Sequence, residues 1–144
     1  MASEDPAAKR LQQLRGIGPM TATALIAALG DGKQFKQGRD ASAWVSLVPR
    51  QHSSGGKDKL LGISKRGDSY LRTLLIHGAR AVIQMASKRD DELSQWIQRL
   101  CRRRNKNVAA VALANKTMRM AWALLTTGAD YQEDYARQNG LVAG

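Results

Sequence analysis

Apolar residues recur every three or four positions along most of the chain, which is the spacing of helices with one buried face. The clearest pattern runs from Asp68, an N-cap candidate, to about Ser87. A last long helix is expected from about Asn107 to Thr127, with Gly128 closing it. No segment is rich in strand signals, so the pattern predicts an all-α fold.

Shorter helices are expected before and between these two. One runs from about Pro6 to Leu14, and a second begins at Pro19 and stops at Gly30. A third is expected from Asp40, as N-cap, to about Leu47. A fourth is opened by Asp90-Asp91-Glu92, where acidic residues favour the positive end of a helix, and is closed by arginines.

Residues 48–67 break this pattern. They hold four glycines, three serines and five basic residues, and show neither a strand nor a helix period, so we expect a loop there. The expected organisation of the chain is a linker or added segment at 1–6, a helix-hairpin-helix-like region at 7–47, a basic Ser/Gly loop at 48–67, a small helical bundle at 68–128 and a flexible tail at 129–144.

Charge narrows the class of partner. The 144 residues carry a formal net charge of +11, and the stretch from Lys33 to Arg119 holds 19 Lys or Arg against 6 Asp or Glu. A surplus of this size points to a polyanion, so nucleic acid is the expected partner.

Other classes of site are disfavoured by composition. Cys101 is the single cysteine, which excludes an internal disulfide and a cysteine-based zinc site, and two histidines are too few to suggest a metal site. No apolar run approaches the roughly 20 residues that span a bilayer, and the N-terminus lacks the features of a signal peptide. We therefore expect a cytosolic protein with no metal or cofactor bound by this chain and no membrane contact.

The segment Leu14-Arg15-Gly16-Ile17-Gly18-Pro19 has the pattern of a helix-hairpin-helix. Its glycines would let backbone N–H groups, together with the positive end of the next helix, face a phosphate. Gly16, Gly18 and Thr21 are therefore candidate nucleic-acid contacts that would not read sequence. The alternative is an ordinary turn between two helices that touches no ligand.

The basic loop offers a second candidate site. Ser53 and Ser54 precede two glycines, and His52 lies close enough in sequence to act as a base or a phosphate contact. Composition alone favours a flexible linker, because most Ser-Ser-Gly-Gly stretches are linkers and a lone serine is no nucleophile until another group activates it. The cations around them are candidate phosphate contacts, with a solvated basic loop as the alternative: Arg50, Lys57, Lys59, Lys65 and Arg66.

The order of these motifs resembles a known family. The blocks are Leu14-Arg15-Gly16-Ile17-Gly18-Pro19, Trp44-Val45-Ser46-Leu47-Val48-Pro49-Arg50, Ser53-Ser54-Gly55-Gly56-Lys57 and Gly62-Ile63-Ser64-Lys65-Arg66-Gly67-Asp68, with Leu71-Arg72 after them. Together they resemble the C-terminal transposase domain of the insertion-sequence one-ten family and its eleven-eleven branch, over roughly Leu11 to Thr127. Arg72, at the end of the last block, joins the candidate nucleic-acid contacts.

The resemblance implies a serine-type DNA recombinase guided by a bridge RNA. In such a protein an N-terminal RuvC-like domain holds Mg²⁺ and the C-terminal domain supplies the nucleophilic serine. By position before the glycine, that serine matches Ser54, with Ser53 as the fallback. The implied partners are DNA, a guide RNA, the RuvC-like domain and further copies of the protein, in a prokaryotic cytoplasm near the nucleoid.

Nothing in the chain resembles the RuvC-like half, so we expect an excised or truncated piece that carries half of an active site and is inactive alone. The rival interpretation is a non-catalytic helix-hairpin-helix module that binds nucleic acid. A third is that the long apolar helix faces pair protomers, which is compatible with either.

Overall fold

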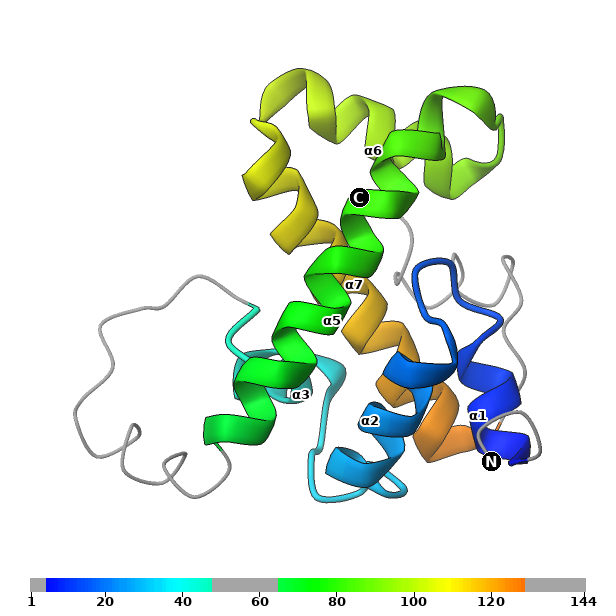
Figure 1. Cartoon of the computed structure of the whole chain (residues 1–144), viewed down its shortest axis with the longest axis vertical. Coiled ribbons are helices and arrows are strands. Elements are labelled where there is room, and N and C mark those ends of the chain that lie inside the picture. Colours follow the sequence, from blue (N-terminus) through cyan, green and yellow to red (C-terminus); the bar gives the residue numbers. More distant parts are fainter. Residues whose placement is uncertain (1–4, 48–64, 129–144) are drawn as a thin grey trace.

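The computed structural model describes residues 5–47 and 65–128, with side chains in the second range from Ser69 onward. Every regular element in these ranges is helical, which confirms the predicted all-α fold. Figure 1 shows them in chain order. Their bounds are α1 Pro6–Leu11, α2 Pro19–Leu29, α3 Gly38–Trp44, α5 Lys65–Met85, the short 3-10 helix η2 Ala86–Lys88, α6 Glu92–Arg103 and α7 Lys106–Thr127.

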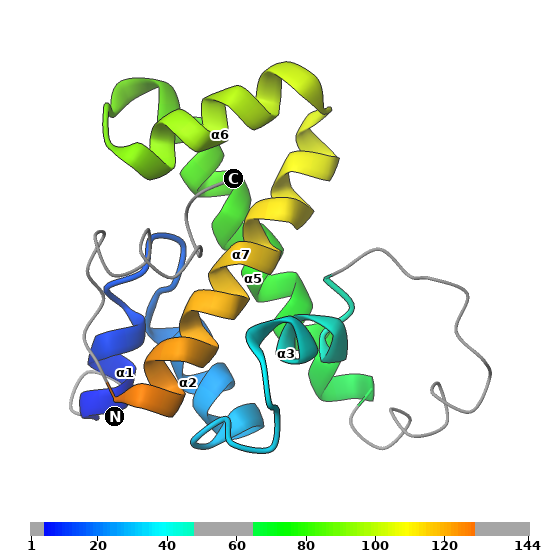
Figure 2. The same cartoon turned by 180° about the vertical axis from the view of Figure 1, so that it is seen from behind.

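The two longest helices, α5 and α7, cross at the centre of the molecule, and the other helices pack around them (Figures 1 and 2). Leu71 and Leu75 of α5 and Leu113 and Met118 of α7 are each at most 2% exposed. Burying a side chain of this size contributes about 1.5–3 kcal/mol relative to leaving it in water. The crossing is therefore the main hydrophobic core.

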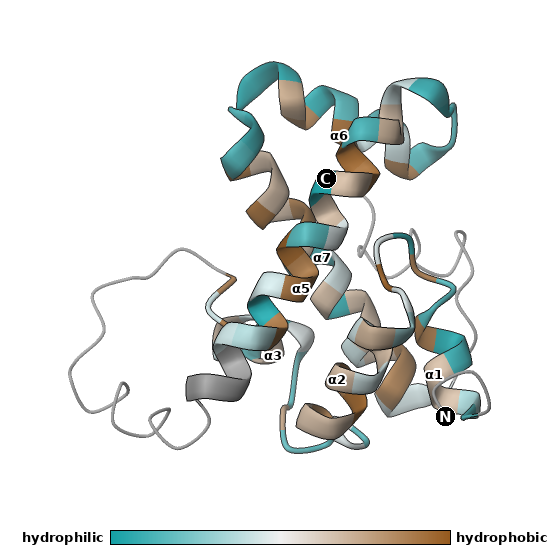
Figure 3. Cartoon of the chain, in the orientation of Figure 1, coloured by the Kyte–Doolittle hydropathy of each residue, from teal (hydrophilic) through white to brown (hydrophobic). Residues whose placement is uncertain are grey.

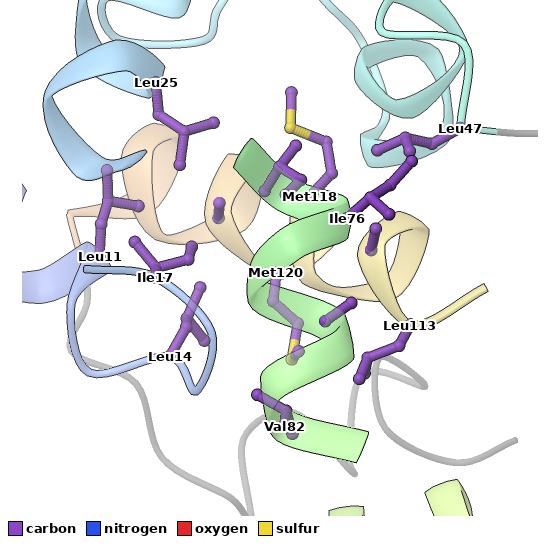
Figure 4. Packing of buried hydrophobic residues seen from close by; sticks show 14 of the residues in the cluster. Leu11, Leu14, Ile17, Leu25, Leu47, Ile76, Val82, Leu113, Met118 and Met120 are labelled. Carbon is purple, nitrogen blue, oxygen red and sulfur yellow. The ribbon is translucent and has the colours of Figure 1, made fainter. Parts of the chain in front are cut away.

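The first two helices lie against this core. Leu11, Leu14, Ile17 and Leu25 are buried, and Figure 4 shows them pointing toward the α5–α7 crossing. The turn after α2 is tied to α7 as well, because the indole N–H of Trp122 donates to the Gly32 carbonyl at 2.9 Å. Residues 5–47 are thus packed onto the long helices and do not form a separate unit.

Several helix boundaries differ from those predicted. The first helix ends at Leu11 because Gln13 and Leu14 bond to carbonyls three residues back, which tightens the chain into turns. The third begins at Gly38, with Gln37 as its N-cap, so Asp40 lies in the first turn. There its carboxylate still favours the positive helix end.

The later boundaries are closer to the prediction. The helix expected from Asp68 begins three residues earlier, at Lys65. Asp91 caps α6, and Asn105 caps α7 by accepting from the backbone N–H of Val108 at 2.9 Å. Gly128 ends α7 with a left-handed φ of 71°, as predicted.

The three tryptophans and the single cysteine lie at the edge of the core. Trp44, Trp96, Trp122 and Cys101 are all partly buried and pack against it. Across the described ranges, no helix is both long and apolar enough to cross a bilayer.

Candidate nucleic-acid interface

The turn between α1 and α2 uses its two glycines differently. Gly16 has a φ of +92° and lies against Gly78 of α5, and a Cβ added at Gly16 would meet the Gly78 carbonyl oxygen at 3.2 Å. Gly18 is exposed, and nothing lies within 4 Å of the position that its Cβ would take. Gly16 therefore serves the turn and the packing, whereas Gly18 has open space around it.

The start of α2 is the exposed part of this turn. Gly18 is the N-cap, Pro19 is the first helical residue, and no side chain caps the helix. The first intrahelical bond runs from Ala22 N–H to the Gly18 carbonyl at 2.9 Å. The N–H groups of Met20 and Thr21 precede that bond, where a helix offers donors to an anion.

The side chains at this helix start differ in exposure. Met20 is 65% exposed, whereas Thr21 is 6% exposed. Thr21 was predicted to contact nucleic acid, and its burial leaves its backbone N–H as the group for such a contact.

The basic Ser/Gly loop at 48–67, called the serine segment from here on, lies mostly outside the described residues. That applies to the candidate nucleophiles and most of the candidate phosphate contacts, namely Arg50, His52, Ser53, Ser54, Lys57 and Lys59. Lys65 and Arg66 lie in the first turn of α5, where only the backbone is described. Their predicted roles stay predictions.

The two ends of that segment are held together. Arg72 Nε on α5 donates to the carbonyl oxygen of Ser46 at 3.2 Å, so it joins the residues after α3 to the second turn of α5. Ser46 has a φ of +60°, and the next residue, Leu47, is 1% exposed and donates its N–H to the Ser42 carbonyl at 2.9 Å. The described structure thus gives Arg72, a predicted nucleic-acid contact, an internal partner at the base of the serine segment.

An ion-pair network ties the α1–α2 turn to α6. Arg15 Nη2 lies 2.6 Å from Asp91 Oδ2, and Arg15 Nη1 donates to Ser94 Oγ at 2.9 Å. Ser94 Oγ in turn donates to Asp91 Oδ1 at 2.8 Å, and Arg89 Nε lies 3.3 Å from the same oxygen. Partial burial raises the pKa of the Asp91 carboxyl, but the Ser94 hydrogen bond and the Arg15 charge outweigh it and hold that pKa below its ordinary value.

Arg15 had no predicted role, although it belongs to the glycine motif. Its partner is distant in the chain, so spacing could not reveal the pair. Asp91 is a favoured N-cap type, but nothing in the sequence around it points to Arg15 as its partner.

A second charged contact joins α6 to α7. Lys116 is 8% exposed, and its Nζ lies 4.5 Å from the centre of the Trp96 ring. Burial, together with the positive charge of Arg119, lowers the pKa of Lys116 to about 8. A lysine over an indole face is a cation–π contact, which offsets part of the cost of burying the charge.

The described ranges contain no group of three or more His, Cys, Asp or Glu side chains that could hold a metal ion. What these ranges offer is cationic groups and backbone donors. Such groups suit a phosphate backbone, whereas a metal needs clustered ligands.

Sequence comparisons give a consistent result. A family model described as Transposase IS116/IS110/IS902 family matches residues 8–95. A probable family 20 transposase of Pseudomonas aeruginosa is 54% identical over 128 residues, covering 89% of this chain and 38% of the relative. The transposase for insertion sequence element IS1111A of Coxiella burnetii is 50% identical over 131 residues, covering 91% of this chain and 35% of the relative.

A more distant relative has a different name. The pilin gene-inverting protein of Moraxella bovis is 26% identical over 122 residues, covering 82% of this chain and 36% of the relative. The chain therefore spans little more than a third of the length of these relatives. No solved structure matches it.

Proposed function

This chain belongs to the IS116/IS110/IS902 transposase family, and on that premise we propose that it is the serine-bearing part of a DNA transposase or recombinase. It binds nucleic acid through its basic surface and supplies Ser54 as the nucleophile for strand exchange. A separate RuvC-like part of the full-length protein completes the active site. A guide RNA selects the DNA target, and several copies act together.

The observation that carries the proposal is the extent of the family match. Residues 8–95 include both the glycine turn before α2 and the serine segment. The fixed base of that segment supports it, because Arg72 and Leu47 hold the two ends on the bundle. A nucleophile needs such a scaffold, since small misplacements of a reacting group are costly.

The proposed reaction is a phosphoryl transfer that conserves the phosphodiester. The Ser54 hydroxyl loses its proton and its oxygen attacks a DNA phosphorus, which forms a phosphoserine bond. The P–O bond to one sugar breaks, and the departing oxygen takes a proton to become a free hydroxyl. That hydroxyl loses its proton and attacks the phosphorus of a phosphoserine bond on a partner strand. The new phosphodiester forms, the P–O bond to the serine breaks and the serine oxygen takes up a proton, so no external energy source is needed.

The residues of this chain contribute charge and position. Arg50, Lys57, Lys65 and Arg66 are proposed to neutralise the phosphate oxygens as charge develops on them. Mg²⁺ held by the RuvC-like part would lower the pKa of the attacking hydroxyl and stabilise the departing oxygen. A relative named for inverting a gene supports exchange between DNA segments.

The test is a covalent protein–DNA adduct that survives denaturation. We expect the full-length protein, with its guide RNA, to form one with target DNA in Mg²⁺. Ser54→Ala should abolish the adduct, and Ser53→Ala should retain it. An adduct that persists in Ser54→Ala and disappears in Ser53→Ala would move the nucleophile to Ser53.

The rival function is a nucleic-acid-binding module without covalent chemistry. The exposed start of α2, with open space around Gly18, is the feature that favours it. Under that interpretation the protein binds DNA but forms no covalent adduct. The wild type, Ser54→Ala and Ser53→Ala would then all lose the bound DNA on denaturation.

A further inference from the structure

One side of α5 is exposed along most of its length. The exposed residues on this side recur at helical spacing, opposite the buried leucines that face α7, and form what we call the exposed stripe of α5. They are Tyr70, Thr73, His77, Arg80, Ala81 and Gln84. At 1.5 Å per residue this stripe is roughly 21 Å long, enough to follow about six nucleotides of a duplex strand.

The stripe leads to a hollow of about 350 Å³ beside the start of α7. Its described lining consists of Arg80, Ile83 and Gln84 from α5 and Lys106 from α7, with no carboxylate. Arg80 Nη1 donates to Asn107 Oδ1 at 3.1 Å, which holds the guanidinium against the first turn of α7. A guanidinium has five N–H donors, so this bond occupies one of them.

The surroundings of the hollow are positively charged. The sequence contains no Asp or Glu from Ser69 to Arg89 or from Leu93 to Ala129. Figure 3 shows hydrophilic residues along the turn between α6 and α7. Three exposed arginines lie at the end of α6 and in this turn, namely Arg102, Arg103 and Arg104.

We propose that the hollow between Arg80 and Lys106 binds a backbone phosphate of a nucleic-acid strand that follows the exposed stripe of α5. The inference rests on the proposed function and adds a second contact surface, away from the serine segment. Charge complementarity selects the partner, because the described lining holds two cations and no carboxylate, which matches a phosphodiester. The contact positions the strand and does not read its sequence.

The test measures binding of the 144-residue chain to a labelled DNA duplex of random sequence and to a labelled RNA hairpin, at several salt concentrations. Arg80→Gln/Lys106→Gln removes both cations. We expect about tenfold weaker binding and a logarithmic salt slope smaller by about 2, one for each lost cation. Gln84→Glu adds a negative charge to the lining and is also expected to weaken binding.

Matched controls remove or add the same charge elsewhere. Lys33→Gln/Lys36→Gln and Gln34→Glu change exposed residues in the connection between α2 and α3, at the opposite end of the molecule from the start of α7 (Figure 1). They should change the salt slope much less. Thermal unfolding of all variants verifies that the fold is kept.

The outcomes separate the two proposals. A loss confined to the DNA probe or to the RNA probe would identify the strand in the hollow, and a loss with both would support a contact shared by the two. Equal effects of the hollow and control variants would overturn this inference while leaving wild-type binding and the Ser54 adduct intact. Failure of the wild-type chain to bind either probe would overturn both the inference and the proposed nucleic-acid binding.

Discussion

At the scale of single residues, one buried cation and one partly buried cation each join distant parts of the described chain. Lys116 lies inside the bundle with its ammonium over Trp96, and Arg15 is bonded to Asp91 and Ser94. Both cations belong to the basic stretch or motif that points to nucleic acid, yet the structure uses both to join helices. A basic residue count therefore overstates the charge that is available to a partner.

Lys116 gives a pH-dependent prediction. Its pKa is about 8 in the folded protein against an ordinary value of 10.5. Between these values the unfolded chain holds more protons than the folded one, so the free energy of unfolding should rise with pH. Relative to Lys116→Met, the wild type should gain on the order of 1 kcal/mol per pH unit in this window.

Urea unfolding of both proteins between pH 7 and pH 10 measures this difference. Lys116→Arg is the control, since an arginine stays charged throughout and its profile should run parallel to that of Lys116→Met. Parallel profiles for the wild type and Lys116→Met would show that the burial of Lys116 does not govern its protonation.

At the scale of helices, apolar spacing together with cap, proline and glycine signals located the α-helices of the described ranges to within a few residues. The helix boundaries were harder to predict, because several residues near a helix start can serve as the N-cap. Asp40 and Asp68 are good N-cap types, yet α3 and α5 begin before them. The pairing of Arg15 with Asp91 and the contact of Arg72 with Ser46 were not predictable either, because both join parts of the chain that only tertiary packing brings together.

The packing of α5 on the glycine turn gives a second prediction. A Cβ added at Gly78 would lie 2.0 Å from the carbonyl oxygen of Gly16, which is backbone and has little freedom to move. In an unconstrained helix Gly→Ala stabilises by about 1 kcal/mol. Gly78→Ala should instead destabilise by about 3 kcal/mol, because α5 and the turn must separate.

Chemical denaturation of Gly78→Ala against the wild type decides the sign. Gly18→Ala is the control, since its added methyl meets open space and should change stability by about 1 kcal/mol or less. A stabilised Gly78→Ala variant would mean that the turn does not pack against α5 in solution.

At the scale of the whole molecule, the family and the all-α architecture followed from the sequence, whereas the active site did not. The candidate nucleophiles Ser53 and Ser54 lie outside the described residues, and the family match assigns the family without assigning a role to either. The chain also spans only 38% and 35% of the length of two relatives. Under the proposed function, the rest of the composite site lies in the part of such proteins that this chain does not cover.

The proposed composite active site predicts that residues 1–144 alone are inactive. A serine hydroxyl needs a base or a metal to lose its proton, and the leaving oxygen needs a proton or a metal as well. Residues 1–144 should therefore bind supercoiled plasmid without nicking it, even with Mg²⁺. Gel analysis of the nicked plasmid measures this, with the Ser54→Ala variant as the comparison. If the wild-type chain nicks the plasmid and Ser54→Ala does not, the active site is not composite.

The contact between Arg72 and Ser46 also has a consequence for engineering. Ser46 lies near the end of the first described range, and its carbonyl is bonded to Arg72 of α5. We therefore expect that residues 48–64 can be exchanged for those of a relative when this contact is kept. Chimeras that import the corresponding stretch from a relative need not redesign the interior. They need only keep the arginine on the helix and the carbonyl that receives its hydrogen bond.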